Sequence, residues 1–303
     1  MKVLKWCCCI TFCVLVGCTS DQSAEAPQRE SRIDRTLPVV MTTIEANRYL
    51  AERVGGSALD VRYPVPSDAD PLAWEPNRAE IAVLQQADLV LLNGAGLEPW
   101  SEHVSLVPSR TEVLADRYRD QWLEFEGVIE HQHGPEGGHS HHGTDPHVWM
   151  DPQLARSHVE QMVEIFSQRF PEGASGFQER GGEVLADLDA LDEQYRTMFA
   201  DLKPTFYANH PAYDYLGRRY GWSLINLDLD PETAPDPSSI PRNRDDSARY
   251  ILWESDPIPA AVAALQAIGL TSVTISPAEH SPETGDWLTA MQENARQFEK
   301  LRE

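Results

Sequence analysis

Short apolar runs alternate with amphipathic stretches along most of the chain, which is the pattern of α/β proteins with helices between parallel strands. In the first half, the apolar runs predict strands at 37–43, 61–65, 88–94 and 112–116. Helical periodicity between them predicts helices near 45–55, 77–87 and 97–105. The second half repeats the rhythm, with strands predicted at 204–210, 222–228, 249–255 and 271–277. We therefore expect two α/β lobes, each built on a parallel sheet.

Two helices are predicted between these halves. The first begins at Asp151, a residue typical of a helix N-cap, because Pro152 then occupies the first helical position. The second is predicted over 183–202, where apolar side chains recur every three or four residues: Val184, Leu188, Leu191, Tyr195, Met198 and Leu202. At 1.5 Å per residue this helix is roughly 30 Å long. We interpret it as a rigid linker between the lobes, the alternative being a helix packed within one domain.

The N-terminus, MKVLKWCCCITFCVLVGCTS, has the features of a secretory signal. Two lysines precede an apolar run that is too short to cross a bilayer comfortably. Its end, Leu15-Val16-Gly17-Cys18, resembles the bacterial lipobox, in which the cysteine becomes the lipidated first residue of the mature protein. We predict a signal peptide at 1–17, lipidation at Cys18 and a disordered polar tether at 18–36. The alternative is an ordinary cleaved signal with an incidental cysteine.

The remaining roughly 265 residues are enough for two lobes at about 100–200 residues per domain. We predict an N-terminal lobe at 37–152, connecting helices at 153–203 and a C-terminal lobe at 204–303. The formal net charge of −23 argues against nucleic acid and anionic membrane surfaces as partners. We expect an exported monomer on the periplasmic or extracellular face of a bacterial membrane.

Six of the ten histidines lie between residues 131 and 152. One of them, His147, stands among apolar neighbours in the motif DPHVWMDP. The others stand among Gly, Pro, Ser and Glu, which favour neither burial nor order: His131, His133, His139, His141 and His142. The contrast predicts a flexible metal-gathering loop at 131–142 beside one fixed metal ligand, His147.

Further candidate ligands follow predicted strands of the second half, since ligands of open α/β sheets bind at the carboxyl ends of strands. His210 ends one strand, Glu254 ends another, and Glu279 and His280 follow a third. A cleft between the lobes would bring them near His147. Imidazole and carboxylate ligands together suit Zn²⁺ or Mn²⁺. The two other histidines are predicted on the surfaces of helices: His103 and His158.

Several long segments, in order, resemble the metal-specific solute-binding proteins of bacterial ABC importers for zinc and manganese, known as cluster A-I. These segments are VVMTTIEANRYLAERVGG, DADPLAWEPNRAEIAVLQQADLVLLNGAGLEPW, DPHVWMDP, HPAYDYLGRRYG and GDWLTAMQENARQFEKL. The resemblance implies two (β/α) lobes joined by a long linker helix and one divalent metal in the cleft. It also implies a lipid anchor and a membrane permease as partner, and it associates the histidine-rich loop with zinc.

The resemblance also implies four metal ligands, two of which this chain keeps. His147 matches the second and His210 the third. The first is expected at Leu72, where the family has histidine after Asp-Pro, and the fourth is expected as an acidic residue near Ser276. Leucine cannot coordinate a metal and a serine hydroxyl does so poorly.

Replacements for the missing ligands are available nearby in the sequence. His280 and Glu279 lie just past Ser276, Glu254 ends the neighbouring strand, and Glu45 follows the first strand. Water could fill a remaining position. We predict a site of His147 and His210 completed from these residues.

Three classes of function remain open. The first is a lipid-anchored metal-binding protein, not an enzyme, that delivers zinc or manganese to a permease. The second is a derived paralogue with weak or no metal in the cleft, acting as a metal buffer, adhesin or interaction module. The third is a metallohydrolase, since two histidines and a carboxylate can bind catalytic zinc, although an HExxH helix is missing from the sequence.

Overall fold

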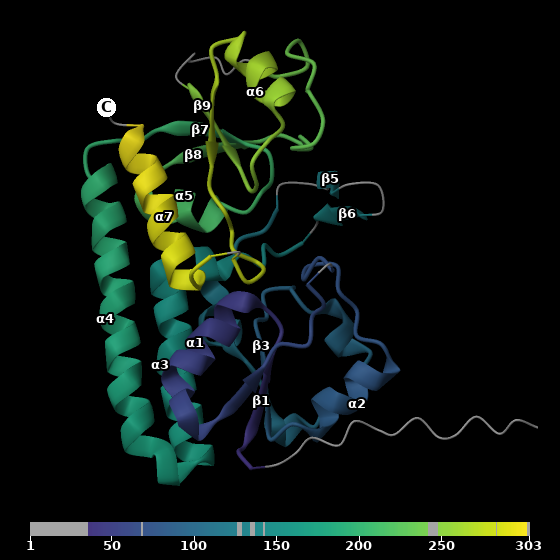
Figure 1. The fold of residues 1–303 in the computed structure, drawn as a ribbon, viewed down its shortest axis with the longest axis vertical. Coiled ribbons are helices and arrows are strands. Elements are labelled where there is room, and N and C mark those ends of the chain that lie inside the picture. The colour runs from purple at the N-terminus through teal and green to yellow at the C-terminus, as the bar shows by residue number, and fades with distance from the viewer. Residues whose placement is uncertain are drawn as a thin grey trace, which may run out of the picture. The chain divides into compact units, whose positions relative to one another are not determined.

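The structure is a computed structural model that describes residues 36–67, 69–125, 129–133, 137–141, 143–241, 248–282 and 284–301. The predicted signal peptide at 1–17, the predicted lipidation site Cys18, residues 18–35 of the predicted tether and His142 lie outside these residues. Figure 1 shows two sheets with long helices beside them. In the described residues, no helix is both long enough and apolar enough to cross a membrane.

The N-terminal lobe is built on a parallel sheet of four strands in the order β2-β1-β3-β4. Its strands and helices lie close to the predicted ranges: β1 (Val39–Thr42), α1 (Glu45–Gly55), β2 (Asp60–Arg62), α2 (Arg78–Gln86), β3 (Leu89–Leu92) and β4 (Thr111–Val113). The described residues of this lobe also form 3-10 segments, among them η1 (Gly56–Ala58), η2 (Pro99–Glu102), η3 (Pro108–Arg110) and η4 (Leu114–Gln121). The helix predicted at 97–105 is therefore wrong, because Pro99 starts only a short 3-10 turn there.

The C-terminal lobe repeats this arrangement, as the sequence predicts. Its parallel strands follow the order β10-β9-β7-β8. The elements are β7 (Thr205–Ala208), α5 (Asp214–Tyr220), β8 (Ser223–Asn226), β9 (Tyr250–Trp253), α6 (Pro259–Gln266), β10 (Thr271–Thr274) and α7 (Trp287–Lys300). In both lobes the strands are short and the turns after their carboxyl ends carry polar residues.

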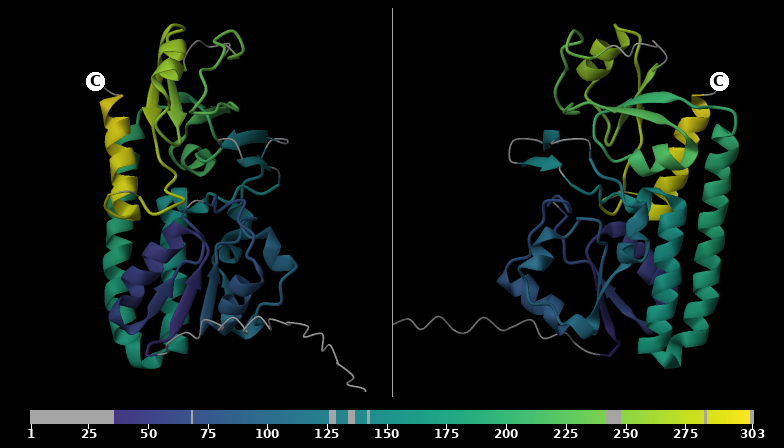
Figure 2. Two further views of the ribbon diagram at one scale, coloured as in Figure 1. Left: turned by 45° about the vertical axis from the view of Figure 1, so that its right-hand side comes forward. Right: turned by 180° about the vertical axis from the view of Figure 1, so that it is seen from behind.

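Two long helices connect the sheets. The first, α3 (Pro152–Arg169), begins as predicted, with the Asp151 side chain accepting a hydrogen bond from the Gln153 N–H at 2.9 Å. After η7 (Pro171–Gly173) follows α4 (Ala174–Phe199), which starts earlier than the predicted 183–202. Figure 2 shows α4 running beside both lobes, with α7 alongside it. The helix thus links the lobes, as the periodicity predicts.

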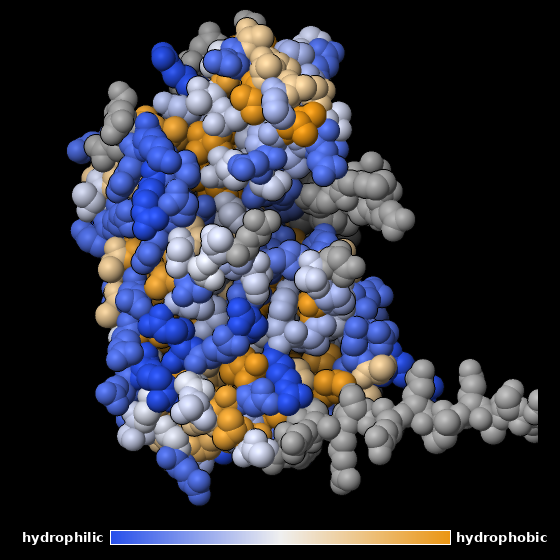
Figure 3. Space-filling view, in the orientation of Figure 1, coloured by the Kyte–Doolittle hydropathy of each residue, from blue (hydrophilic) through white to orange (hydrophobic). Residues whose placement is uncertain are grey.

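Buried side chains explain why the lobes and helices hold together. The apolar face of α4 joins one continuous core with α1, α3, α5 and α7. Tyr195 of α4 stacks on Tyr220 of α5, with 5.1 Å between ring centroids. Trp287, the first residue of α7, packs on Tyr49 of α1 and so links the last helix to the first lobe. On the face drawn in Figure 3, the surface over α4 and α7 is largely hydrophilic.

The histidine-rich segment differs from the expected flexible loop. Its backbone forms an antiparallel hairpin of β5 (Ile129–His133) and β6 (Gly137–His141), in which His131 pairs with His139. The stem of the hairpin is closed by a hydrogen bond of 2.8 Å from the Phe125 N–H to the Gly143 carbonyl. Backbone pairing supplies an order that composition alone did not predict, because hairpin hydrogen bonds do not require apolar side chains.

Candidate metal centre

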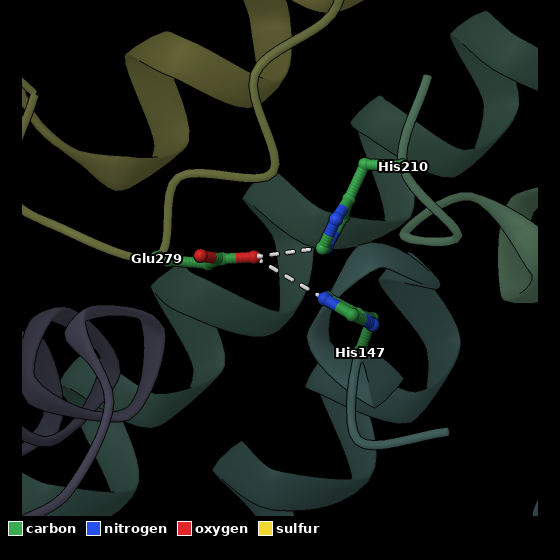
Figure 4. Close-up of side chains that lie close together, drawn as sticks. All are labelled: His147, His210 and Glu279. Carbon is green, nitrogen blue, oxygen red and sulfur yellow. Dashed lines mark hydrogen bonds and ion pairs between the residues drawn. The ribbon is translucent and has the colours of Figure 1, made fainter. Parts of the chain in front are cut away.

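Three side chains from distant parts of the chain converge at one place: His147, His210 and Glu279. Each offers a ligand atom, and these atoms lie within 4.8 Å of one another. Figure 4 shows the Glu279 carboxylate pointing at the two imidazole rings. His147 precedes the 3-10 segment η6 (Val148–Met150), His210 follows β7 and Glu279 follows β10. The carboxyl-end positions of His210 and Glu279 are those expected from the sequence.

His147 is completely buried, and its ring orientation is set by a neighbouring carboxylate. Asp145 Oδ1 lies 2.7 Å from the ring Nδ1 and also accepts a hydrogen bond of 2.9 Å from the backbone N–H of His147. The Nδ1 atom therefore carries the hydrogen, and Nε2 is directed at Glu279 Oε1, 3.2 Å away. A carboxylate behind a histidine in this way is common around metals, because it fixes the tautomer and makes the free nitrogen more basic.

The buried charges around His147 change its acidity. Burial alone lowers the pKa of this histidine, but the negative charge and hydrogen bond of Asp145, followed by those of Glu279, outweigh it and raise the pKa to about 10. Without a metal the ring is therefore protonated at neutral pH and bridges two carboxylates. A bound cation would take the place of this proton.

His210 completes the pair of imidazoles. Its ring is nearly perpendicular to that of His147, at 88°, with 5.4 Å between centroids. Its Nε2 lies 3.9 Å from Glu279 Oε1, and its Nδ1 lies 3.5 Å from Glu254 Oε2. Glu254 is thus placed behind His210 on the side away from Glu279. The Glu254 N–H donates to Asn209 Oδ1 at 3.0 Å, which fixes this end of β9.

The turn that carries Glu279 is anchored at several points. The Asn294 side chain of α7 bonds both the N–H and the carbonyl of Ser276, at 3.0 and 2.7 Å. The indole of Trp149, two residues after His147, donates to the Pro277 carbonyl at 2.8 Å. Ala278 then adopts a left-handed conformation with φ of 50°, which costs about 1–3 kcal/mol for a residue with a side chain. These contacts aim Glu279 at the histidines.

In the described residues, the replacement ligands Glu254, His280 and Glu45 lie outside this group of three, and so do Leu72 and Ser276, the positions at which the family resemblance implies ligands. His280 is half-buried and lies outside the cluster of ligand atoms found in the described residues. Glu45 is fully buried but bonds Arg48 at 2.5 and 2.7 Å and accepts from the Ser281 hydroxyl at 2.8 Å. Leu72 is half-buried and packs against the main core. Ser276 Oγ accepts a hydrogen bond from the Ala278 N–H, so it serves the turn.

Three features of the structure were not predicted from the sequence. Asp145 could have been suspected from its place two residues before His147. Tyr63, which follows β2, has a buried hydroxyl without a hydrogen-bond partner in the part of the chain described here, and its pKa is raised by burial and by the charges of Glu45 and Glu279. His158 was predicted on the surface and is instead fully buried beside Tyr118 and Asn47. Burial of this kind depends on tertiary partners.

The donor set fits a divalent cation of the zinc type. Two imidazole nitrogens and a carboxylate oxygen match the ligands that zinc prefers. Bonds of about 2.0–2.2 Å would place such ligands roughly 3–4 Å apart. The Glu279 oxygen lies 3.2 Å from the His147 nitrogen and 3.9 Å from the His210 nitrogen. With three protein ligands, water can occupy a fourth position. The site could therefore hold one ion reversibly between residues from both lobes.

Known proteins resemble this chain over most of its length. A family model described as zinc-uptake complex component A, periplasmic, matches residues 40–301. Among curated proteins, the high-affinity zinc uptake system protein ZnuA of Bacillus subtilis (strain 168) is 28% identical over 242 residues, covering 76% of this chain and 73% of that protein. The zinc-binding lipoprotein AdcA of Streptococcus pneumoniae serotype 4 is 24% identical over 298 residues; this chain spans 57% of its length, and 93% of this chain is covered.

Solved structures show the same fold. The crystal structure of the metal-dependent lipoprotein YcdH from Bacillus subtilis superposes with a TM-score of 0.74 at 23% identity, covering 87% of this chain and 98% of that one. The Zn(II)-bound AdcA of Streptococcus pneumoniae gives a TM-score of 0.71 at 21% identity, covering 87% of this chain and 57% of that one. These solved structures confirm the predicted fold of two α/β lobes.

Proposed function

This chain belongs to the zinc-uptake complex component A family, and from that premise we propose that it is the extracytoplasmic solute-binding component of an ABC importer, with zinc as its cargo. The relatives named above for zinc uptake and zinc binding support this proposal. The partner is then a membrane permease that accepts the ion. Catalysis has no place in this role, so we propose that the protein is not an enzyme.

The convergence of His147, His210 and Glu279 carries the proposal. These residues come from both halves of the chain, yet their ligand atoms lie within 4.8 Å. We propose that all three bind the ion, that water completes the shell, and that Asp145 and Glu254 orient the two imidazoles from behind. This assigns Glu279 the carboxylate role expected near Ser276, and gives Glu254 and His280 no direct bond to the ion.

Selectivity for zinc over manganese follows from the donor set. Imidazole nitrogens suit zinc, whereas manganese prefers carboxylate, carbonyl and water oxygens. Zinc also accepts four-coordination with three protein ligands, whereas the hard cations prefer about six oxygens. Two buried histidines and one carboxylate therefore favour zinc, and Mn²⁺ should compete weakly.

The N-terminal segment and the histidine-rich segment suggest a location and an accessory role for the protein. We propose that Cys18 is lipidated and holds the protein on the outer face of a bacterial membrane. We further propose that the histidines of the histidine-rich segment 131–142 gather zinc weakly beside the tight site: His131, His133, His139, His141 and His142.

Leu72 supports a second candidate function. It stands where the family resemblance implies a histidine ligand, and it packs against the core. A three-ligand site would bind more weakly than one with four. The second candidate is therefore a derived paralogue that buffers metal or contacts other molecules, without delivering zinc to a permease.

Zinc titration separates these functions. The mature protein, with the hairpin removed, is titrated against a chromophoric chelator of known zinc affinity. The transport proposal predicts one site that binds zinc tightly enough to compete with the chelator. It also predicts that an excess of Mn²⁺ does not displace this zinc. Binding weaker than micromolar would favour the second candidate, and hydrolysis of esters or peptides by the zinc-loaded protein would contradict both.

A further inference from the structure

A continuous chain of buried hydrogen bonds crosses the N-terminal lobe and ends beside His147. It begins at the Tyr118 hydroxyl of η4, which contacts Nε2 of His158 in α3. The other ring nitrogen of His158, Nδ1, lies 2.8 Å from Asn47 Oδ1 in α1. Asn47 Nδ2 donates to Asn93 Oδ1 at 3.3 Å, and Asn93 Nδ2 donates to the Pro146 carbonyl at 3.1 Å.

The direction of every hydrogen in this chain is fixed by its neighbours. Asn47 uses its amide nitrogen toward Asn93, so its oxygen accepts and His158 Nδ1 must carry the hydrogen. His158 Nε2 then accepts from the Tyr118 hydroxyl. The imidazole is accordingly neutral, in keeping with its burial, which lowers the pKa of His158 to about 3. Donors aligned in one direction strengthen one another in a dry interior.

The last acceptor belongs to the peptide group that joins Pro146 to His147. The carbonyl of this peptide accepts from Asn93 Nδ2 at 3.1 Å, and its N–H donates to Asp145 Oδ1 at 2.9 Å. The same Asp145 oxygen holds the ring of His147. The peptide plane is therefore held from both edges, which leaves His147 little freedom to rotate its backbone.

Asn93 is itself fixed by a second group of contacts. Its N–H and that of Gly94 donate to the Glu98 carboxylate at 2.8 and 3.0 Å, while the Thr43 hydroxyl donates to the same carboxylate. Asn93, Asn47 and His158 are completely buried. In a packed interior none of them can turn without leaving a buried polar group unsatisfied.

We infer that Asn93 is a positioning residue for metal binding: its amide holds the peptide between Pro146 and His147, and the hydrogen-bonded chain of Tyr118, His158 and Asn47 holds Asn93 in turn. This inference rests on the proposed function. The N-terminal half of the site is thereby fixed before the ion arrives, while His210 and Glu279 are placed by the other lobe. An ion then binds without first ordering His147, so removal of Asn93 should weaken binding although it touches neither ion nor ligand ring.

The test compares Asn93→Ala with Leu50→Ala, a buried control one helical turn from Asn47 in α1 that is outside the chain of hydrogen bonds. Two quantities are measured on the mature protein: zinc affinity by chelator competition, and the NMR signal of the His147 Nδ1–H in the metal-free state. The signal is assigned with His147→Gln. Asn93→Ser, whose hydroxyl is too short to reach the Pro146 carbonyl, replaces Asn93→Ala if the latter does not fold.

We expect the Asn93 variant to bind zinc about tenfold more weakly, as for loss of an outer-shell partner, and to lose or broaden the His147 signal. The Leu50→Ala control should be less stable than wild type, yet keep the wild-type zinc affinity and the His147 signal. Wild-type behaviour of the Asn93 variant in both measurements would overturn the inference, as would an equal loss in the control. Should wild type fail to bind zinc, the proposed function fails, and the metal-free signal alone decides the role of Asn93.

Discussion

The Nε2 atom of His147 lies 3.2 Å from the Oε1 atom of Glu279, although 132 residues separate them in the chain. The same oxygen lies 3.9 Å from Nε2 of His210. One carboxylate oxygen thus faces both imidazoles. This arrangement makes the turn after β10 as important to the site as the two histidine motifs.

The first prediction concerns the carboxylate. Glu279→Gln keeps the shape of the side chain but removes its charge. Loss of a residue that only hydrogen-bonds a metal ligand already weakens metal binding about 10–100-fold, so the zinc affinity of this variant should fall at least about tenfold. Glu254→Gln is the matched control, because Glu254 lies behind His210, and its effect should be smaller. Chelator competition measures both. A larger loss in the Glu254 variant would mean that the ligand assignment is reversed.

The second prediction concerns pH and zinc binding. The pKa of metal-free His147, lowered by burial but raised more by Asp145 and Glu279, is about 10. Zinc needs the neutral ring, so binding at pH 7–9 should release about one proton, and affinity should rise with pH throughout this range. An ordinary histidine would instead lose affinity only as the pH drops through about 6.5.

Calorimetry in two buffers of different ionisation enthalpy measures the released proton. Asp145→Asn removes the main raising charge, so at pH 8 the variant should release clearly less than one proton. In the metal-free protein the raised pKa stabilises the fold below about pH 6.5, and this contribution is lost as pH rises through about 10. Equal proton release from wild type and variant would count against this role of Asp145.

The third prediction concerns the stability of the N-terminal lobe in acid. Burial lowers the pKa of His158 to about 3, so the folded protein keeps this ring neutral while the unfolded chain protonates it near pH 6.5. Its contribution to stability is therefore present above pH 6.5 and is lost as pH falls toward 3. His158→Gln should lack this dependence. Urea unfolding at pH 7 and pH 5 measures it, and parallel losses in both proteins would contradict the assignment.

The fourth prediction concerns the hairpin. The Phe125 N–H lies 2.8 Å from the Gly143 carbonyl, so residues 127–141 can be replaced by a short glycine linker. The melting temperature and one tight zinc site should stay nearly unchanged, while additional weak sites disappear. Thermal unfolding and zinc stoichiometry measure this. A large drop in melting temperature would show that the hairpin supports the fold.

The fifth prediction concerns Leu72. If this position adjoins the ion, as the family resemblance implies, Leu72→His should add a nitrogen ligand and tighten zinc binding at least about tenfold. If Leu72 serves only the core, the new ring loses its packing and costs about 1–3 kcal/mol as an unsatisfied buried group. Calorimetry on hairpin-deleted proteins decides between them. Weaker binding in a folded variant would favour the derived paralogue.

Periodicity and strand patterns predicted most of the fold. The helix expected at 45–55 and the N-cap at Asp151 appear as predicted, because both depend on local sequence. The order in the histidine-rich segment, the burial of His158 and the aim of Glu279 were not predicted. The hairpin depends on backbone pairing within the segment, whereas the burial of His158 and the direction of the Glu279 side chain depend on partners distant in sequence. Glu279 also depends on the left-handed conformation of Ala278, which a residue with a side chain seldom adopts.

The central claim is that His147, His210 and Glu279 hold one zinc ion. The most direct measurement is anomalous diffraction at the zinc edge from crystals of the hairpin-deleted protein grown with one equivalent of zinc. The account predicts a single peak about 2.0–2.2 Å from a nitrogen of each histidine and an oxygen of Glu279. A peak bound elsewhere, or a zinc-saturated protein whose ion touches fewer than two of these residues, would contradict it.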